Sequence, residues 1–120
     1  MDTSLNWYSN ILGFEILNKT DLPERGFRQA NLKQGKILLE LIQLDAAVTQ
    51  EEISSKYSPK TKIAGFFKLG FAVEQFDQWV KALQDAKVSF NGSVVNDPVS
   101  GKKMVIIKDP DGNRIQFFEK

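Results

Sequence analysis

The sequence contains neither cysteine nor histidine among its 120 residues. Without cysteine the chain has no disulfides, no thiolate nucleophile and no thiolate metal ligand. Without histidine it lacks both the commonest general base and the commonest metal ligand. Any site in this protein is therefore built from carboxylates, amides, amines, guanidinium groups, hydroxyls and the backbone.

A charge excess and a long apolar run are also lacking. The chain has 16 Lys and Arg against 15 Asp and Glu, a net charge of +1, so it offers no basic field for nucleic acid or an anionic membrane. No apolar run approaches the roughly 20 residues of a membrane span, and the polar residues after Met1 do not resemble a signal sequence. We expect a cytoplasmic protein with neither nucleic acid nor membrane as a partner.

The composition that remains is that of a soluble globular protein. Hydrophobic residues make up 42% of the sequence and charged residues 26%. A chain of 120 residues can bury a hydrophobic core without covalent staples. We therefore expect one domain.

The last part of the chain carries the clearest local pattern. Asp109-Pro110-Asp111-Gly112-Asn113 is a dense turn signal, because proline presets φ, Asp and Asn bond their own backbone and glycine accepts positive φ. β-branched and aromatic residues fill the flanking runs 104–107 and 115–118. This predicts a β-hairpin. Gln116 projects from the face opposite its apolar neighbours in the second strand.

Helical spacing of apolar residues appears twice. The first helix is predicted over 3–12, with capping residues at 2–4 and Gly13 at its end. The second is predicted over 76–86, where Asp77 and Lys81 are spaced for a weak surface pair.

The remaining segments predict strands and loops. A loop is expected over 21–26, and a polar connector over 45–65 carries a capping-box pattern at residues 49–52. Two strands contain a charged residue among apolar ones: Glu40 and Lys68. The predicted strands are 14–17, 27–33, 37–44, 66–73 and 88–95.

The order of elements indicates an internal duplication. The second half begins with a strand, continues with a helix and ends with three strands, and the first half repeats this order from its helix onward. Glu40 and Gln116 occupy equivalent places. The fold class is α+β, and the residues expected to face the helices are Ile37, Leu39, Leu41, Leu69, Phe71, Val105, Ile107, Ile115 and Phe117.

Three segments resemble the vicinal oxygen chelate superfamily, which includes glyoxalase I, extradiol dioxygenases, and bleomycin and fosfomycin resistance proteins. They are the helix Asn6-Trp7-Tyr8 through Leu12-Gly13-Phe14, the strand from Phe67 to Glu74, and the turn from Asp109 to Asn113. The resemblance implies two βαβββ modules that form a cup-shaped mixed sheet. Module 1 would cover about 1–45, the connector 46–65 and module 2 about 66–120.

The resemblance also implies where a divalent metal would be held. The ligand places fall on a first strand that would lie before Met1, on Glu40, on Lys68 where His is usual, and on Gln116 where Glu is usual. A protonated lysine has no lone pair to donate. One carboxylate and one amide are too few for a zinc or magnesium site. We therefore predict no metal and no cofactor. The first module lacks its opening strand, and a truncated or mis-started copy is a further alternative.

Glu40, Lys68, Gln116 and Arg114 would all point to one concave face under this fold, and we predict that they bind a ligand. Ordinary explanations stay open for each residue. Glu40 could lie on a solvent-exposed face, Lys68 could extend to water along Phe66, Gln116 could bond a backbone group and Arg114 could be solvated. Trp7 and Tyr8 are expected to be packing residues.

The resulting functional hypothesis is a metal-independent protein that binds or sequesters a small molecule. The alternative is a glyoxalase-like lyase or a dioxygenase-like metalloenzyme with an unconventional or partner-completed metal site. A metal-free enzyme with Lys68 as base or Schiff-base former is a further variant. Because the first module exposes a sheet edge, we also expect a homodimer.

Overall fold

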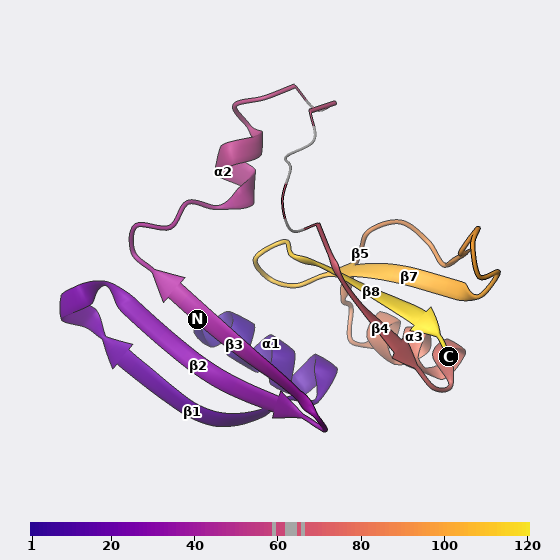
Figure 1. Ribbon diagram of the computed structural model, residues 1–120, viewed down its shortest axis with the longest axis horizontal. Helices are drawn as coiled ribbons and strands as arrows, with labels where there is room; N and C mark the ends of the chain where they lie inside the picture. Colours follow the sequence, from indigo (N-terminus) through magenta and orange to yellow (C-terminus); the bar gives the residue numbers. More distant parts are fainter. Residues whose placement is uncertain (59, 62–64, 66) are drawn as a thin grey trace. The chain divides into compact units, whose positions relative to one another are not determined.

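The computed structural model describes residues 1–58, 60–61, 65 and 67–120. The chain divides into two compact units, Met1–Thr61 and Lys62–Lys120. Each unit combines strands with helices, so the predicted α+β class is confirmed (Figure 1). None of the helices in the described ranges has the length and apolar character needed to cross a bilayer.

The first unit is a helix packed against a three-stranded antiparallel sheet of order β1-β2-β3. The helix α1 ends at Gly13, whose φ of 72° is the left-handed conformation that glycine adopts without strain. β3 lies at one edge of this sheet. The bounds are α1 Asp2–Leu12, β1 Glu15–Leu22, the 3-10 turn η1 Pro23–Arg25, β2 Phe27–Gln34, β3 Ile37–Leu44 and the short helix α2 Gln50–Ser54.

The second unit packs one helix against a mixed sheet of order β4-β8-β7-β5, with β6 also pairing with β7. β4 runs parallel to β8, and the other pairs are antiparallel. β8 therefore has a strand on both sides, unlike its counterpart β3. The bounds are β4 Leu69–Val73, α3 Phe76–Asp85, β5 Ser89–Phe90, β6 Val95–Asn96, β7 Lys103–Lys108 and β8 Arg114–Glu119.

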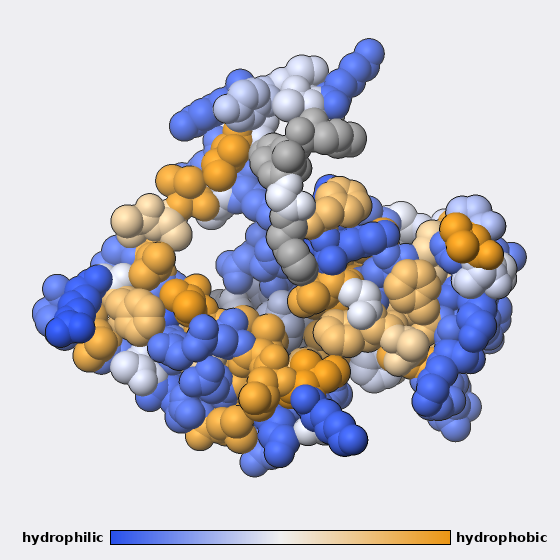
Figure 2. Space-filling model, in the orientation of Figure 1, coloured by the Kyte–Doolittle hydropathy of each residue, from blue (hydrophilic) through white to orange (hydrophobic). Residues whose placement is uncertain are grey.

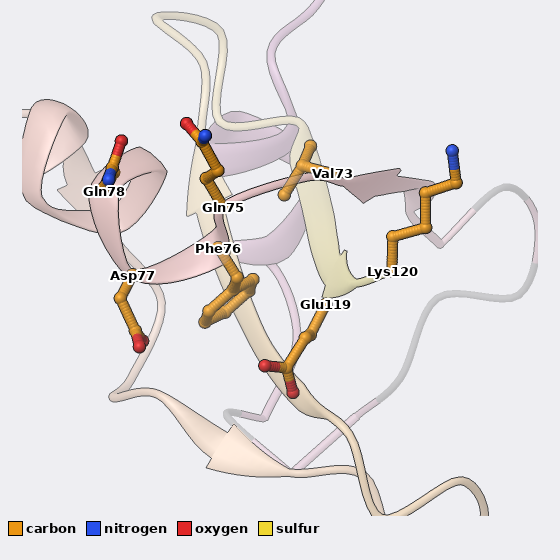
Figure 3. Close-up of a pocket in the computed structure, with 7 residues that line it drawn as sticks. All are labelled: Val73, Gln75, Phe76, Asp77, Gln78, Glu119 and Lys120. Carbon is orange, nitrogen blue, oxygen red and sulfur yellow. The ribbon is translucent and has the colours of Figure 1, made fainter.

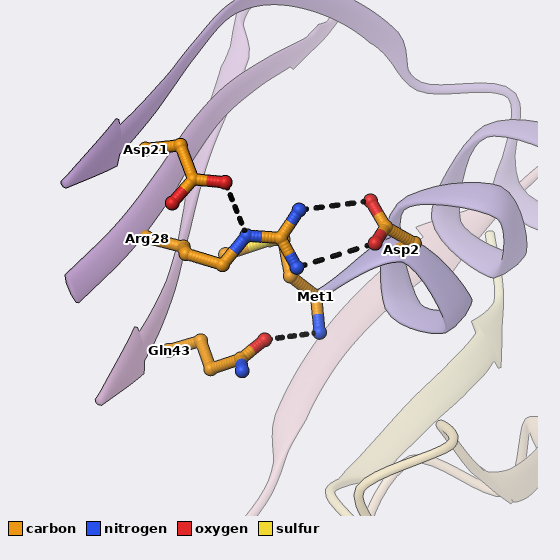
Figure 4. A network of polar contacts seen from close by, with 5 residues as sticks. All are labelled: Met1, Asp2, Asp21, Arg28 and Gln43. Atoms are coloured by element: carbon orange, nitrogen blue, oxygen red, sulfur yellow. Dashed lines mark hydrogen bonds and ion pairs between the residues drawn. The ribbon is translucent and has the colours of Figure 1, made fainter. Parts of the chain in front are cut away.

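A polar network fixes α1 on its sheet (Figure 4). The guanidinium of Arg28 in β2 donates to both carboxylate oxygens of Asp2, at 3.2 and 3.3 Å, and its Nε lies 3.1 Å from Asp21 Oδ2 in β1. The amine of Met1 donates to Gln43 Oε1 in β3 over 2.7 Å. Arg28 therefore ties the start of the helix to two strands, and its hydrogen bonds to Asp2, together with its charge, lower the pKa of Asp2.

Side-chain alternation sorts each sheet into two faces, as predicted. Leu38 is 72% exposed and Ala72 is exposed, so neither packs under a helix. Two members of the predicted set, Ile37 and Leu69, are also exposed, because each is the first residue of its strand. The rest confirm the register: Val105, Ile107, Ile115 and Phe117 are buried, and Leu39, Leu41 and Phe71 are half-buried.

The predicted hairpin is confirmed, and the buried carboxylate of Asp109 holds its turn. Asp109 Oδ1 accepts the backbone N–H groups of Asp111 and Asn113, at 3.0 and 2.7 Å, and Oδ2 accepts the Asn113 side-chain amide at 2.9 Å. The bonds set the register in which Lys108 opposes Arg114 and Ile106 opposes Gln116. Residues 109–113 therefore form a turn, as predicted.

Several predicted strand boundaries were wrong. The first strand runs through residues 21–22, where a loop was expected, because Asp21 and Leu22 continue the pairing with β2. The strand predicted over 88–95 is two short pieces, β5 and β6, separated at Gly92 with φ 96°. The strand predicted over 66–73 begins at Leu69, so Lys68 precedes β4, and Phe66 lies outside the described residues.

Two predictions about helix surfaces also need correction. Asp77 does not pair with Lys81; Lys103 of β7 bonds Asp77 at 2.7 Å and Lys81 bonds Asp85 at 2.7 Å. No side chain caps α1, whose N-cap position is Met1. The capping box before α2 is confirmed, since Thr49 and Glu52 each accept from the other's backbone N–H.

The Arg28 network predicts a specific pH dependence of stability. Because the folded-state pKa of Asp2 lies below the ordinary value, the pair stabilises the fold above that value and loses its effect as the pH falls through the folded pKa. We expect Arg28→Met to lose less thermal stability on acidification than the parent protein. Thermal melts followed by circular dichroism across the acid range measure this. Arg25→Met in η1 is the matched control, and an Arg28→Met profile parallel to the parent's would contradict the assignment.

Candidate functional site

We call the face of each sheet opposite its helix the open face, because the predicted ligand residues project there. In the first unit, Glu40 stands in the middle of β3, opposite Asn31 of β2. Gln29 donates a hydrogen bond to the Glu40 carboxylate, and the Asn31 amide donates to Asn18 Oδ1 at 2.9 Å. Glu40 is exposed. Together with the side-chain amides of Gln29, Asn31 and Asn18 it forms a polar row across β3, β2 and β1, which we call the amide row.

Apolar side chains flank this polar row. Leu38 and Ile42 lie on either side of Glu40 along β3 and are 72% and 53% exposed, and Leu44 continues the same face. Figure 2 shows hydrophobic residues in orange beside hydrophilic ones in blue over the sheet of the first unit. A face that mixes exposed apolar groups with hydrogen-bonding groups is suited to an amphipathic molecule.

Gln116 is the most enclosed of the predicted residues, at 1% exposed. It lies on the open face of β8, between Ile106 of β7 and Gly70 of β4. A Cβ at Gly70 would come within 3.1 Å of the Phe118 ring, so the missing side chain leaves room for that ring beside Gln116. The Gln116 amide donates to the Met104 thioether and not to a backbone group. Its Oε1 has no hydrogen-bond partner among the described residues.

Lys68 and Arg114 meet at the ring of Phe67. The Arg114 guanidinium carbon lies 4.8 Å from the ring centroid and the Lys68 Nζ lies 5.9 Å from it, both at cation–π distance. Lys108 stands directly opposite Arg114 in the β7–β8 ladder, so the two share the open face. Lys108 at the end of β7, Arg114 at the start of β8 and Lys68 just before β4 form a set of three cations, which we call the cationic row.

The carboxylate of Asp97 is within electrostatic range of Lys68. Asp97, in the loop before β7, accepts the Ser100 hydroxyl at 2.7 Å and the Ser100 N–H at 2.8 Å. These bonds, with a smaller contribution from the charge of Lys68, lower the pKa of Asp97. Asp97 Oδ2 is therefore engaged by Ser100, and the carboxylate lies in the positive field of Lys68.

Three of the four predicted residues share one surface. Lys68, Gln116 and Arg114 belong to the second unit, and Glu40 belongs to the first. That Glu40 shares one concave face with these three residues stays a prediction.

Sequence reasoning missed Lys108, Phe67 and the amides that accompany Glu40. Strand alternation could have found Lys108, because the hairpin turn places it opposite Arg114. It could also have found Gln29 and Asn31, which alternate with the helix-facing Ala30. No sequence pattern predicts the position of Phe67, since that residue lies outside the strand.

The residues present do not fit a protein-held divalent cation. The described ranges contain no group of three or more His, Cys, Asp or Glu side chains placed to share a metal ion. In the second unit the positions expected to ligate carry a lysine and an amide, and three positive charges would repel a dication.

A separate pocket of about 320 Å³ lies where β4, α3 and β8 end or begin (Figure 3). Its lining includes Asp77, Glu119 and Lys120, and none of the predicted residues. Asp77 pairs with Lys103, and Lys120 pairs with Glu74 at 2.7 Å. Glu119 Oε2 accepts the backbone N–H of Lys103 at 3.2 Å. These side chains are thus engaged within the second unit, and the pocket adds nothing to the candidate site.

Comparison with known proteins agrees with this architecture. The family model described as "Glyoxalase/Bleomycin resistance protein/Dioxygenase superfamily" matches residues 1–117. The chain belongs to this superfamily. A glyoxalase family protein from Enterococcus faecalis has a crystal structure with a TM-score of 0.83, at 26% identity over 99% of this chain and 88% of that one. The resemblance noted in the sequence is confirmed.

Two curated relatives in the superfamily carry enzyme names. A probable chloroplastic lactoylglutathione lyase of Arabidopsis thaliana is 32% identical over 100% of this chain and 33% of its own length. A catechol-2,3-dioxygenase of Bacillus subtilis is 27% identical over 98% of this chain and 37% of its own length. The chain thus spans about a third of the length of these relatives.

The orphan oxygen of Gln116 predicts a stabilising substitution. A buried acceptor without a donor costs about 1–3 kcal/mol. Gln116→Met keeps a similar shape and removes that acceptor, so we expect the free energy of unfolding to rise by about 1 kcal/mol. Urea titration followed by fluorescence measures the change. Gln84→Met, at an exposed residue of α3, is the control. A destabilised Gln116→Met would show that the amide is held in the free protein.

Proposed function

We propose that this protein binds or sequesters a small molecule on the open face of its second unit without a protein-held metal. The observation that carries the proposal is the combination at one surface of a buried amide with an orphan oxygen and the cationic row beside it. A ligand that donates to Gln116 Oε1 would remove the cost of that buried acceptor. Binding would thus recover free energy that the free protein lacks.

The chemistry of these groups supports binding more than catalysis. An amide neither takes nor gives a proton at neutral pH, so Gln116 can orient a ligand but cannot serve as an acid or base. Glu40 is the carboxylate predicted for the site, and it already accepts a hydrogen bond from Gln29. With no cysteine or histidine in the chain, the usual nucleophile–base pairs are not available.

The names of the relatives favour a second candidate. Proteins called lactoylglutathione lyase and catechol-2,3-dioxygenase match nearly the whole chain. Under this alternative the protein is a glyoxalase-like lyase or a dioxygenase-like metalloenzyme, with donors from a partner chain beside Glu40. The two candidates differ in metal content.

The metal-free proposal predicts the result of elemental analysis. We expect protein purified without chelators to contain far less than one metal per chain, and to stay so after incubation with zinc, nickel or manganese and gel filtration. The three cations on the open face would repel a divalent metal ion at the place where a metal site would offer it ligands. Inductively coupled plasma mass spectrometry measures the content.

Glu40→Gln is the matched variant for this measurement. Under the metal-free proposal, this substitution leaves the metal content unchanged, because Glu40 holds no metal. Stoichiometric metal in the parent that disappears in Glu40→Gln would overturn the proposal and support the metalloenzyme.

We also propose that the chain forms a homodimer. β3 ends the sheet of the first unit, and its exposed apolar residues include Leu38, Ile42 and Leu44. Backbone groups on a free edge and apolar groups on a half-covered sheet both gain by contact with another chain.

Sedimentation velocity tests this assembly. We expect a dimer at micromolar concentration in the parent. Leu38→Lys places a charge among the exposed apolar residues, so we expect it to shift the equilibrium towards monomer, whereas Val99→Lys, at an exposed loop residue of the second unit, leaves it unchanged. A parent that sediments as a monomer contradicts the proposal.

A further inference from the structure

The cationic row is built into the framework of the second unit. Arg114 and Lys108 are the first residue of β8 and the last of β7, directly opposed in the ladder next to the Asp109 turn. Lys68 reaches the same end of the sheet from the start of β4, since it and Arg114 contact one ring. The ends of β7 and β8 and the residue before β4 therefore bring three positive charges to one end of the sheet.

The charges of this row are not consumed by internal salt bridges. In the described part of the chain, the lysine and arginine side chains in salt bridges are those of Arg28, Lys81, Lys103 and Lys120. The two hydrogen bonds from Ser100 to Asp97 Oδ2 lower the pKa of Asp97, and the charge of Lys68 adds a smaller contribution. Like charges held on adjacent strands repel one another. An anion that bridges them would relieve the repulsion.

Phe67 orients the guanidinium in this row. Its ring is 58% exposed, and the Arg114 guanidinium lies 4.8 Å from its centroid. A guanidinium held over a ring keeps its N–H fork free at the edge, where it matches a carboxylate with two parallel hydrogen bonds. The uncovered part of the Phe67 ring remains available to a second planar group.

The open face beyond the row is mostly apolar. Along β8, Gln116 follows Arg114, and Phe118 follows Gln116 on the same face. Their partners on β7 are Ile106 and Met104. A ligand with its charged group on the row would thus have carbon-rich surface beside it and the Gln116 amide as a polar contact.

We propose that the cationic row is an anion subsite and that its ligand is a small aromatic carboxylate. The carboxylate would lie across Arg114 and Lys108, with Lys68 supplying a third positive charge. The aromatic ring would lie against the exposed part of Phe67. The inference rests on the binding function proposed above and names its ligand class.

Titration calorimetry with 1-naphthoate and its neutral analogue 1-naphthamide tests the subsite. We expect the carboxylate to bind about tenfold more tightly than the amide, since hydrogen bonds to a charged group are the stronger kind. Raising the ionic strength should weaken naphthoate binding and leave naphthamide binding unchanged.

Matched variants locate the effect. Arg114→Met and Lys108→Met should each weaken naphthoate binding by about tenfold and change naphthamide binding little. Lys102→Met removes the same charge from an exposed residue outside the row and should bind naphthoate as the parent does. Phe67→Leu should weaken naphthoate binding, and Phe67→Tyr should restore it, because the ring and not its bulk orients Arg114. Thermal melts confirm that each variant is folded.

Each result supports or rejects the subsite. Naphthoate that binds equally well to Arg114→Met, Lys108→Met and the parent rejects it, as does naphthoate that fails to bind up to its solubility limit. Equal affinity for naphthoate and naphthamide also rejects it, but leaves the proposed small-molecule binding intact. Stoichiometric metal would instead reject the proposed function.

Discussion

The buried carboxylate of Asp109 is the constraint on which the second unit depends. By accepting the backbone N–H groups of Asp111 and Asn113, it sets how β7 and β8 are paired. Because side chains alternate between faces, a shift of one residue would turn Gln116 towards the helix and Ile115 and Phe117 towards the open face. The position of every candidate residue on β8 therefore follows from one side chain in a tight turn.

This register gives the open face an electrostatic character unlike that of a metal centre. A metal centre needs side chains with lone pairs to donate. Lys68, Arg114 and Lys108 instead place three hydrogen-bond donors with positive charge at one end of the sheet. The chain has the superfamily architecture, as the match over residues 1–117 shows, and on its open face this architecture carries positive charge. Function in such a fold is decided by the few residues on the open face and not by the framework that presents them.

Local chemistry made much of the fold predictable. The Asp109–Asn113 turn, the two helices, the capping box at Thr49 and the inward set of β7 and β8 all follow from short-range rules. The site was predictable in part, because alternation indicates which face Glu40, Gln116 and Arg114 share with their neighbours. The features that were not predicted depend on contacts between residues distant in sequence. Arg28 holds α1 on the sheet by its ion pair with Asp2, and Asp77 pairs with Lys103 instead of Lys81. Phe67 makes cation–π contacts with Lys68 and Arg114.

β1 contains one residue more than its partner strand requires. The pairing runs from Ile16 opposite Leu32 to Asn18 opposite Asn31, so Leu17 is a bulge without a partner of its own. Because side chains alternate between the two faces of a strand, the loss of one residue moves every later side chain of that strand to the opposite face. At the bulge, the loss of Leu17 would preserve the alternation, with Asn18 still opposite Asn31 and Asp21 still opposite Arg28. The first unit can thus change its length by one residue here while its amide row and its anchor to the helix remain in place.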